Sequence, residues 1–118
     1  MRISIRASSA KATDAVRQYV QRRLLRSVGH HASRVESVHV RLRDVNGTRG
    51  GVDQQCSLEV SFARLRPIVA ESTQRTLRLA VDEACARLER ALLRTLELRR
   101  DKRRSPPRKP ARRRASPA

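Results

Sequence analysis

The chain has 118 residues, enough for one domain and too few for two of comparable size. It carries 28 Lys and Arg against 11 Asp and Glu, a formal net charge of +17, which predicts a polyanionic partner, nucleic acid first. With one Phe, one Tyr and no Trp, binding would depend on phosphates and shape and not on base stacking. Two cysteines make no disulfide framework, and no apolar run suits a membrane helix or a secretory signal, so we expect a cytoplasmic protein.

The first half of the chain predicts a strand, a helix and a second strand. Residues 2–6 alternate polar and apolar side chains, as a half-buried strand does. Thr13 is a suitable N-cap for a helix whose apolar residues recur every four positions. We expect that helix to stop at Gly29, because glycine readily adopts the left-handed conformation at a helix end. Residues 38–43 alternate again and predict the second strand.

The second half predicts two more strands and a long helix. A glycine-rich turn at 46–51 leads into the clearest alternation of the chain, at residues 56–62. Residues 67–71 offer a short fourth strand, which begins at a proline. Thr76 is a second N-cap, and the apolar stripe after it predicts a helix to about Arg100.

The order β-α-β-β-β-α predicts an α+β fold in which a four-stranded sheet has two helices packed on one face, as in a double-stranded RNA-binding domain. Short connections favour an antiparallel meander for strands two to four, whereas the first strand can pair in parallel. The open sheet face is expected to meet water. Its polar side chains are Arg2, Arg6, Arg41, Arg43, Ser57, Glu59 and Ser61.

The C-terminal segment differs in composition from the rest. Residues 101–118 hold eight basic residues, one acidic residue and four prolines, without apolar periodicity. We therefore divide the chain into a folded domain at 1–100 and a disordered basic tail at 101–118.

Several segments resemble the ribosome hibernation-promoting factor / ribosome-associated inhibitor family in its short form. The matching segments are the strand that opens at Arg2, the helix start at 12–20, the strand at 35–45, and the Leu79-Ala80-Val81-Asp82 run with Leu88. The resemblance implies a protein that is not an enzyme and that binds the small ribosomal subunit over the path of messenger and transfer RNA, silencing translation in stationary phase or stress. The sequence after residue 104 does not look able to form the long form's dimerisation domain, so we expect no self-association through such a domain. Arg78 stands where the family usually has a Tyr.

Basic side chains recur along one side of each predicted helix. At about 100° per residue, basic positions fall on the side away from the apolar stripe. Arginine rows suit RNA phosphates, because a guanidinium can donate two hydrogen bonds to one phosphate. Pairs such as Glu83–Arg87 and Arg78–Asp82 support the simpler interpretation of solvated helix faces. The resemblance also places ribosomal RNA against these helices, and the residues carried over as RNA-binding are Arg22, Arg26, Arg87, Arg90 and Arg94.

Other residues carry little chemistry. The histidines and Cys56 and Cys85 lack zinc-site spacing, and both cysteines fall on apolar faces. We therefore predict no metal, no cofactor and no small-molecule substrate. A row of Leu79, Ala86 and Leu93 is expected to pack against the first helix. Two alternative functions stay open: a generic double-stranded RNA-binding module, and a protein-interaction modulator of an alternative sigma factor that would use this row.

Overall fold

The computed structural model describes residues 1–45 and 53–104, with side chains up to residue 95. Four strands form one sheet in the order β1-β2-β3-β4: Arg2–Ala7 (β1), Val35–Asp44 (β2), Gln54–Phe62 (β3) and Ile68–Gln74 (β4). β1 pairs with β2 in parallel, and the other pairs are antiparallel. This mixed sheet confirms the predicted α+β order and the parallel pairing of the first strand.

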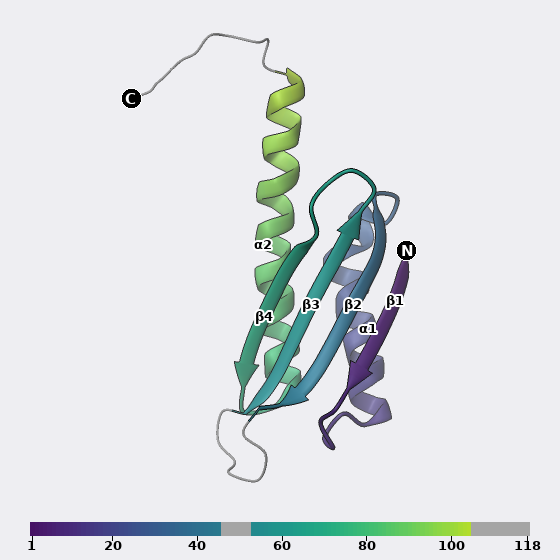
Figure 1. Ribbon diagram of the computed structural model, residues 1–118, viewed down its shortest axis with the longest axis vertical. Coiled ribbons are helices and arrows are strands. Elements are labelled where there is room, and N and C mark those ends of the chain that lie inside the picture. The colour runs from purple at the N-terminus through teal and green to yellow at the C-terminus, as the bar shows by residue number, and fades with distance from the viewer. Residues whose placement is uncertain (46–52, 105–118) are drawn as a thin grey trace, which may run out of the picture.

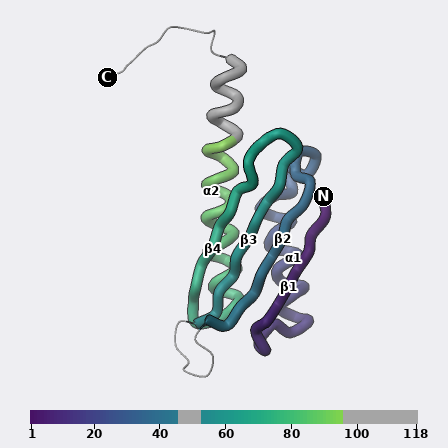
Figure 2. The backbone as a smooth tube through the Cα atoms, viewed as in Figure 1, coloured from purple at the N-terminus to yellow at the C-terminus, as the bar shows by residue number. Residues whose placement is uncertain are grey.

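Both helices cover the same face of the sheet, so the molecule has two layers (Figures 1 and 2). They are α1 (Asp14–Val28) and α2 (Leu77–Arg104). Thr13 caps α1 by accepting a hydrogen bond from the Val16 amide at 3.3 Å, and Thr76 caps α2 through the Leu79 amide at 3.2 Å. Both predicted caps are confirmed, and they fix where each helix starts on the sheet.

Helix α1 stops at Gly29 as predicted, but the conformation of this glycine differs from the prediction. Gly29 has right-handed helical backbone angles, φ −58° and ψ −36°, and not the left-handed conformation. The chain continues as a 3-10 turn at Gly29–His31 (η1) before β2 begins. A 3-10 turn can satisfy the last carbonyls of a helix, so no left-handed residue is needed there.

The long helix α2 ends at Arg104, past the predicted end near Arg100. No proline occurs before Pro106 in this part of the sequence, so the backbone can continue its hydrogen bonding through residues 101–104. Figure 1 shows this helix extending beyond the end of the sheet. The rest of the predicted tail and the predicted turn at 46–51 lie outside the described residues, so the division into a domain and a disordered tail stays a prediction.

The core lies between the two layers. The apolar sides of the strands and the apolar stripes of both helices meet there, as their periodicity predicted. Burial of these side chains holds both helices to one face and leaves the other face of the sheet open. The core residues with no exposed surface are Val20, Leu24, Val28, Val38, Leu42, Cys56, Leu58, Val60, Ala80, Val81, Ala84, Cys85 and Leu88.

Candidate nucleic-acid interface

The outer side of the helical layer carries the five arginines predicted to bind RNA. All five side chains are exposed, which follows from their positions opposite the buried stripes of α1 and α2. Arg22 and Arg26 lie on α1, and Arg87, Arg90 and Arg94 lie on α2. The structure therefore leaves these cations accessible, and whether RNA contacts them stays a prediction.

Of these five, Arg87 also has a contact within the fold. Its Nε donates to Glu83 Oε1 at 3.1 Å, and its NH1 donates to the backbone oxygen of Glu71 at 2.6 Å. The predicted Glu83–Arg87 pair thus forms, and it holds Arg87 on the β4 side of α2. The side chains of Arg22, Arg26, Arg90 and Arg94 form no ion pair within the described part of the chain.

The apolar row on α2 does not pack as expected. Leu79 is 51% exposed and Leu93 is 58% exposed, so the predicted packing of this row against the first helix is wrong. The reason is the rotation of α2: polar side chains of α2 face α1, and the row lies farther round the helix, toward solvent.

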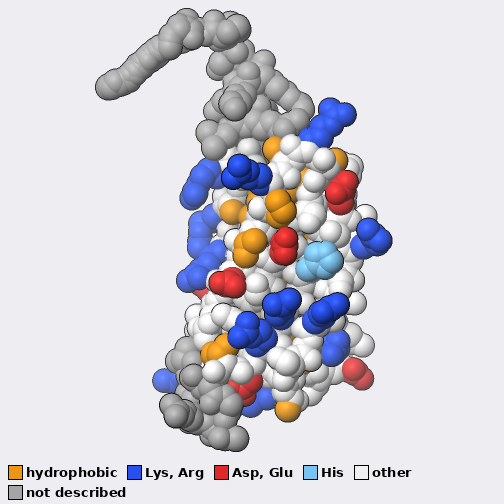
Figure 3. Space-filling view, viewed as in Figure 1, with side chains coloured by type: hydrophobic (Ala, Val, Ile, Leu, Met, Phe, Trp, Pro, Cys, Tyr) orange, Lys and Arg blue, Asp and Glu red, His pale blue; other side chains and the backbone are white. Residues whose placement is uncertain are grey.

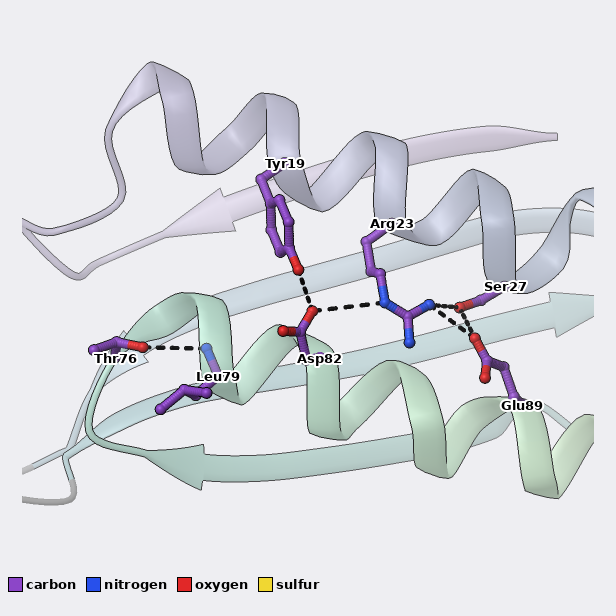
Figure 4. Close-up of polar contacts among 7 residues, drawn as sticks. All are labelled: Tyr19, Arg23, Ser27, Thr76, Leu79, Asp82 and Glu89. Carbon is purple, nitrogen blue, oxygen red and sulfur yellow. Dashed lines mark hydrogen bonds and ion pairs between the residues drawn. The ribbon is translucent and has the colours of Figure 1, made fainter.

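The two helices meet along a polar seam made by Tyr19, Arg23 and Ser27 of α1 and Asp82 and Glu89 of α2 (Figure 4). Arg23 NH1 donates to Glu89 Oε2 at 2.8 Å, and Arg23 Nε lies 3.6 Å from Asp82 Oδ1. Ser27 Oγ donates to Glu89 Oε2 at 2.5 Å, and the Tyr19 hydroxyl donates to Asp82. The predicted Arg78–Asp82 pair is replaced by these contacts across the seam.

Electrostatics in the seam follow from this arrangement. The hydrogen bond from Ser27, together with the Arg23 guanidinium, lowers the pKa of Glu89 below its usual value. The hydrogen bond to Asp82 and partial burial raise the pKa of the Tyr19 hydroxyl. Arg78 places its guanidinium 4.9 Å from the centre of the Tyr19 ring, a cation–π contact between the two helices.

Sequence reasoning missed this seam, although a signal was present. Tyr19, Arg23 and Ser27 recur every four residues on one side of α1, and Asp82 and Glu89 are seven residues apart on α2. Such spacings place each set on one helix side, and their charges are complementary. The seam therefore engages two carboxylates of α2 with side chains of α1.

The cysteines and histidines add no reactive centre. Cys56 and Cys85 are fully buried, and burial raises the pKa of both thiols. Burial and the neighbouring Arg34 lower the pKa of His31. In the described part of the chain no cluster of His, Cys, Asp and Glu could hold a metal ion. Within the same residues, no helix is both long enough and apolar enough to cross a bilayer.

Comparisons with known proteins agree with this fold. A solved ribosomal subunit interface protein from Coxiella burnetii superposes with a TM-score of 0.70 at 16% identity, covering 82% of this chain and 99% of that one. The N-terminal domain of Protein Y from Thermus thermophilus gives a TM-score of 0.61 at 24% identity, covering 80% and 94% of the two chains. These likenesses show a shared fold.

A search of curated proteins gave no match. The family described as Sigma 54 modulation protein / S30EA ribosomal protein matches residues 3–100, nearly the whole described chain. The chain therefore belongs to the Sigma 54 modulation protein / S30EA ribosomal protein family, whose members are ribosome-binding modulators and not enzymes.

Proposed function

We propose that this protein is a cytoplasmic hibernation factor that binds ribosomal RNA of the small subunit over the path of messenger and transfer RNA. It acts by occupancy: a folded basic domain fills space that translation requires, and no reaction is catalysed. Its expression in stationary phase or stress would silence ribosomes when growth stops. Membership of the family supports ribosome binding, and the surface of the helices supports RNA as the contacted component.

One observation carries the proposal: two carboxylates of α2 are engaged by side chains of α1, whereas several arginines of the helices have no carboxylate partner among the described residues. Asp82 and Glu89 turn into the seam between the helices, whereas Arg22, Arg26 and Arg90 stay exposed without an ion pair among the described residues. Arginines outnumber carboxylates on the described helices, so this surface attracts phosphates, although Glu83 remains on it as the partner of Arg87. Arg94 and the partly engaged Arg87 extend the same surface along α2.

Charge reversal on α2 tests the proposal. The protein should co-sediment with 30S and 70S particles and inhibit translation in a cell-free reaction, and the triple variant R87E/R90E/R94E should lose both properties. The matched control R34E/R64E/R66E changes the charge equally at exposed residues of the connections between elements. Full binding and inhibition by the α2 variant, or equal loss in the control, would overturn the assignment of RNA binding to the helices.

A second candidate function, modulation of an alternative sigma factor through protein contact, is favoured by the exposed leucines Leu79 and Leu93. Under this alternative, Leu79→Ser with Leu93→Ser should abolish capture of RNA polymerase subunits from cell extract while ribosome binding persists. A generic double-stranded RNA module would instead bind an isolated RNA duplex as tightly as it binds ribosomes. Strong preference for ribosomes in that comparison excludes the generic module.

A further inference from the structure

On the open face of the sheet, opposite the helices, the arginines lie on the β1–β2 half. Arg2 and Arg6 of β1 and Arg41 and Arg43 of β2 are all exposed on this face. The carboxylates of the face, Glu59 and Glu71, lie on β3 and β4. Figure 3 shows Lys and Arg side chains gathered over part of the sheet beside a histidine.

The strand register brings two of these arginines together. Arg6 is the register partner of Arg41, so their backbones are on neighbouring strands about 4.8 Å apart. Next to Arg41, on β3, is Ser57 and not an acid. Like charges placed opposite each other destabilise a sheet, and neither arginine has an ion pair within the described residues. The pairing of Arg6 with Arg41 therefore does not serve the stability of the sheet.

A shallow hollow surrounds the pair. Arg6 and Arg41 line it together with His39 and the hydroxyl residues Ser4 and Ser57, and Glu59 and Ser61 lie at its β3 side. Its volume is about 450 Å³. Guanidinium groups and hydroxyls are the usual donors to phosphate oxygens, and the hollow offers both.

We propose that the β1–β2 half of the open sheet face is a second RNA-binding surface, in which Arg6 and Arg41 bind phosphates of an RNA segment different from the one at the helices. The surface contains no Phe, Tyr or Trp among the described residues, and His39 is the ring that it offers for base stacking, so its arginines would bind mainly the backbone of the RNA. Arg43 lies two residues after Arg41 on the same side of β2, about 7 Å farther along, which continues the cationic track.

This second surface deepens the proposed function and rests on it. The helices and the open face are on opposite sides of the sheet (Figure 1), so a single RNA backbone strand passing over one side does not reach the other. A domain with cations on both sides can bind one RNA segment at the helices and another at the open sheet face, and so be held between them. Binding by two faces would also raise the salt dependence above that of either face alone.

The test measures binding to purified small-subunit RNA and, separately, to intact small subunits, as a function of salt. R6E/R41E should weaken binding about tenfold or more in both cases, and the log–log salt slope should become shallower by about 0.7–0.9 for each phosphate that the variant no longer neutralises. R6Q/R41Q should give a smaller shift in the same direction. The control R64E/R66E has the same charge change in the β3–β4 connection, at the other end of the sheet, and should stay within about threefold of wild type, since it alters none of the arginines proposed to bind phosphate.

Photo-crosslinking locates the RNA. Both native cysteines are fully buried, so a thiol-reactive photo-crosslinker would label Ser57→Cys on the sheet or Gln18→Cys on α1. The two probes should mark different RNA segments of the small subunit. No crosslink to RNA from Ser57→Cys, or wild-type affinity in R6E/R41E, would overturn the second surface while leaving the helices as the binding face. A loss in R64E/R66E equal to that in R6E/R41E would also overturn it. Failure of wild type to bind small-subunit RNA would overturn both proposals.

Discussion

The inner and outer sides of α1 use the same residue types in opposite ways. Arg22 is exposed and unpaired among the described residues, whereas the side chain of Arg23 is 14% exposed and contacts two carboxylates of α2. Leu24 is fully buried, whereas its neighbour Leu25 is 51% exposed. One step along the helix, about 100° of rotation, decides whether a side chain stabilises the fold or stays available to a partner.

The largest difference between the two sides of α1 is expected in the free energy of unfolding when Leu24 and Leu25 are each changed to Ala. Leu24→Ala removes a fully buried side chain from the core and should lower the free energy of unfolding by about 3 kcal/mol, the usual cost of such a cavity. Leu25→Ala should lower it by less than about 0.5 kcal/mol, as surface substitutions do. Urea unfolding followed by circular dichroism measures both. Equal effects in the two variants would mean that α1 is rotated from its described orientation.

The arginine pair should show a smaller contrast. Arg23→Met keeps most of the aliphatic stem but leaves Glu89 and Asp82 without their cation, so we expect stability to fall by about 2 kcal/mol. Arg22→Met should change stability by less than about 0.5 kcal/mol. In ribosome binding the order should reverse, with Arg22→Met weakening affinity more than Arg23→Met at equal folded concentration. If Arg23→Met had the larger effect on both stability and ribosome binding, the two arginines would not have the separate roles in folding and binding that we assign to them.

The hydrogen bond from the Tyr19 hydroxyl to Asp82 should make a smaller contribution to stability than the contacts of Arg23. Tyr19→Phe removes the hydrogen bond to Asp82 and keeps the ring under Arg78, so stability should fall by about 1 kcal/mol. Thermal unfolding of Tyr19→Phe measures the contribution of the hydroxyl, and that of Arg78→Ala measures the contribution of the guanidinium over the ring. A neutral Tyr19→Phe would mean that Asp82 is held by Arg23 alone.

The smallest effect is a pH dependence from Glu89. Its folded pKa lies below the usual value near 4.5 because Ser27 and Arg23 stabilise the carboxylate. A lowered folded pKa gives stability that is present above the unfolded pKa and is lost as the pH falls through the folded pKa. The stability difference between wild type and Glu89→Gln should therefore be constant near neutral pH and shrink below about pH 4.5. A difference that does not vary from neutral pH down through this range contradicts this role.

Local sequence signals predicted the elements well, because they depend on neighbours along the chain. Thr13 and Thr76 cap their helices as predicted, and alternation placed the first three strands. The fourth strand, predicted at 67–71 without clear alternation, extends to Gln74. The signals failed where partners are distant in sequence. Arg23 and Glu89 are 66 residues apart, and periodicity gives the side of a helix but not its rotation against a neighbour. The same limit explains why Leu79 and Leu93 were expected to be covered.

For the candidate site, the sequence predicted that the five arginine side chains are exposed, but it did not predict all the contacts that they make. Helical spacing was enough to place the five arginines on outer sides, since the apolar stripe fixes the inner side. It did not reveal that Arg87 also holds the edge of β4 through the Glu71 carbonyl. Nor did it pair Arg6 with Arg41, because register between strands depends on the assembled sheet.

The central claim is that arginines on the exposed surface bind RNA phosphates, and the salt dependence of binding to purified small subunits tests it most directly. If about six phosphates are neutralised, the logarithm of the affinity should fall with the logarithm of salt concentration with a slope of about −4 to −5. The combined variant of Arg22, Arg26, Arg87, Arg90 and Arg94, each changed to Gln, should make that slope shallower by about 0.7–0.9 for each phosphate that it no longer neutralises. A wild-type slope near zero, or an unchanged slope in the variant, would contradict the claim.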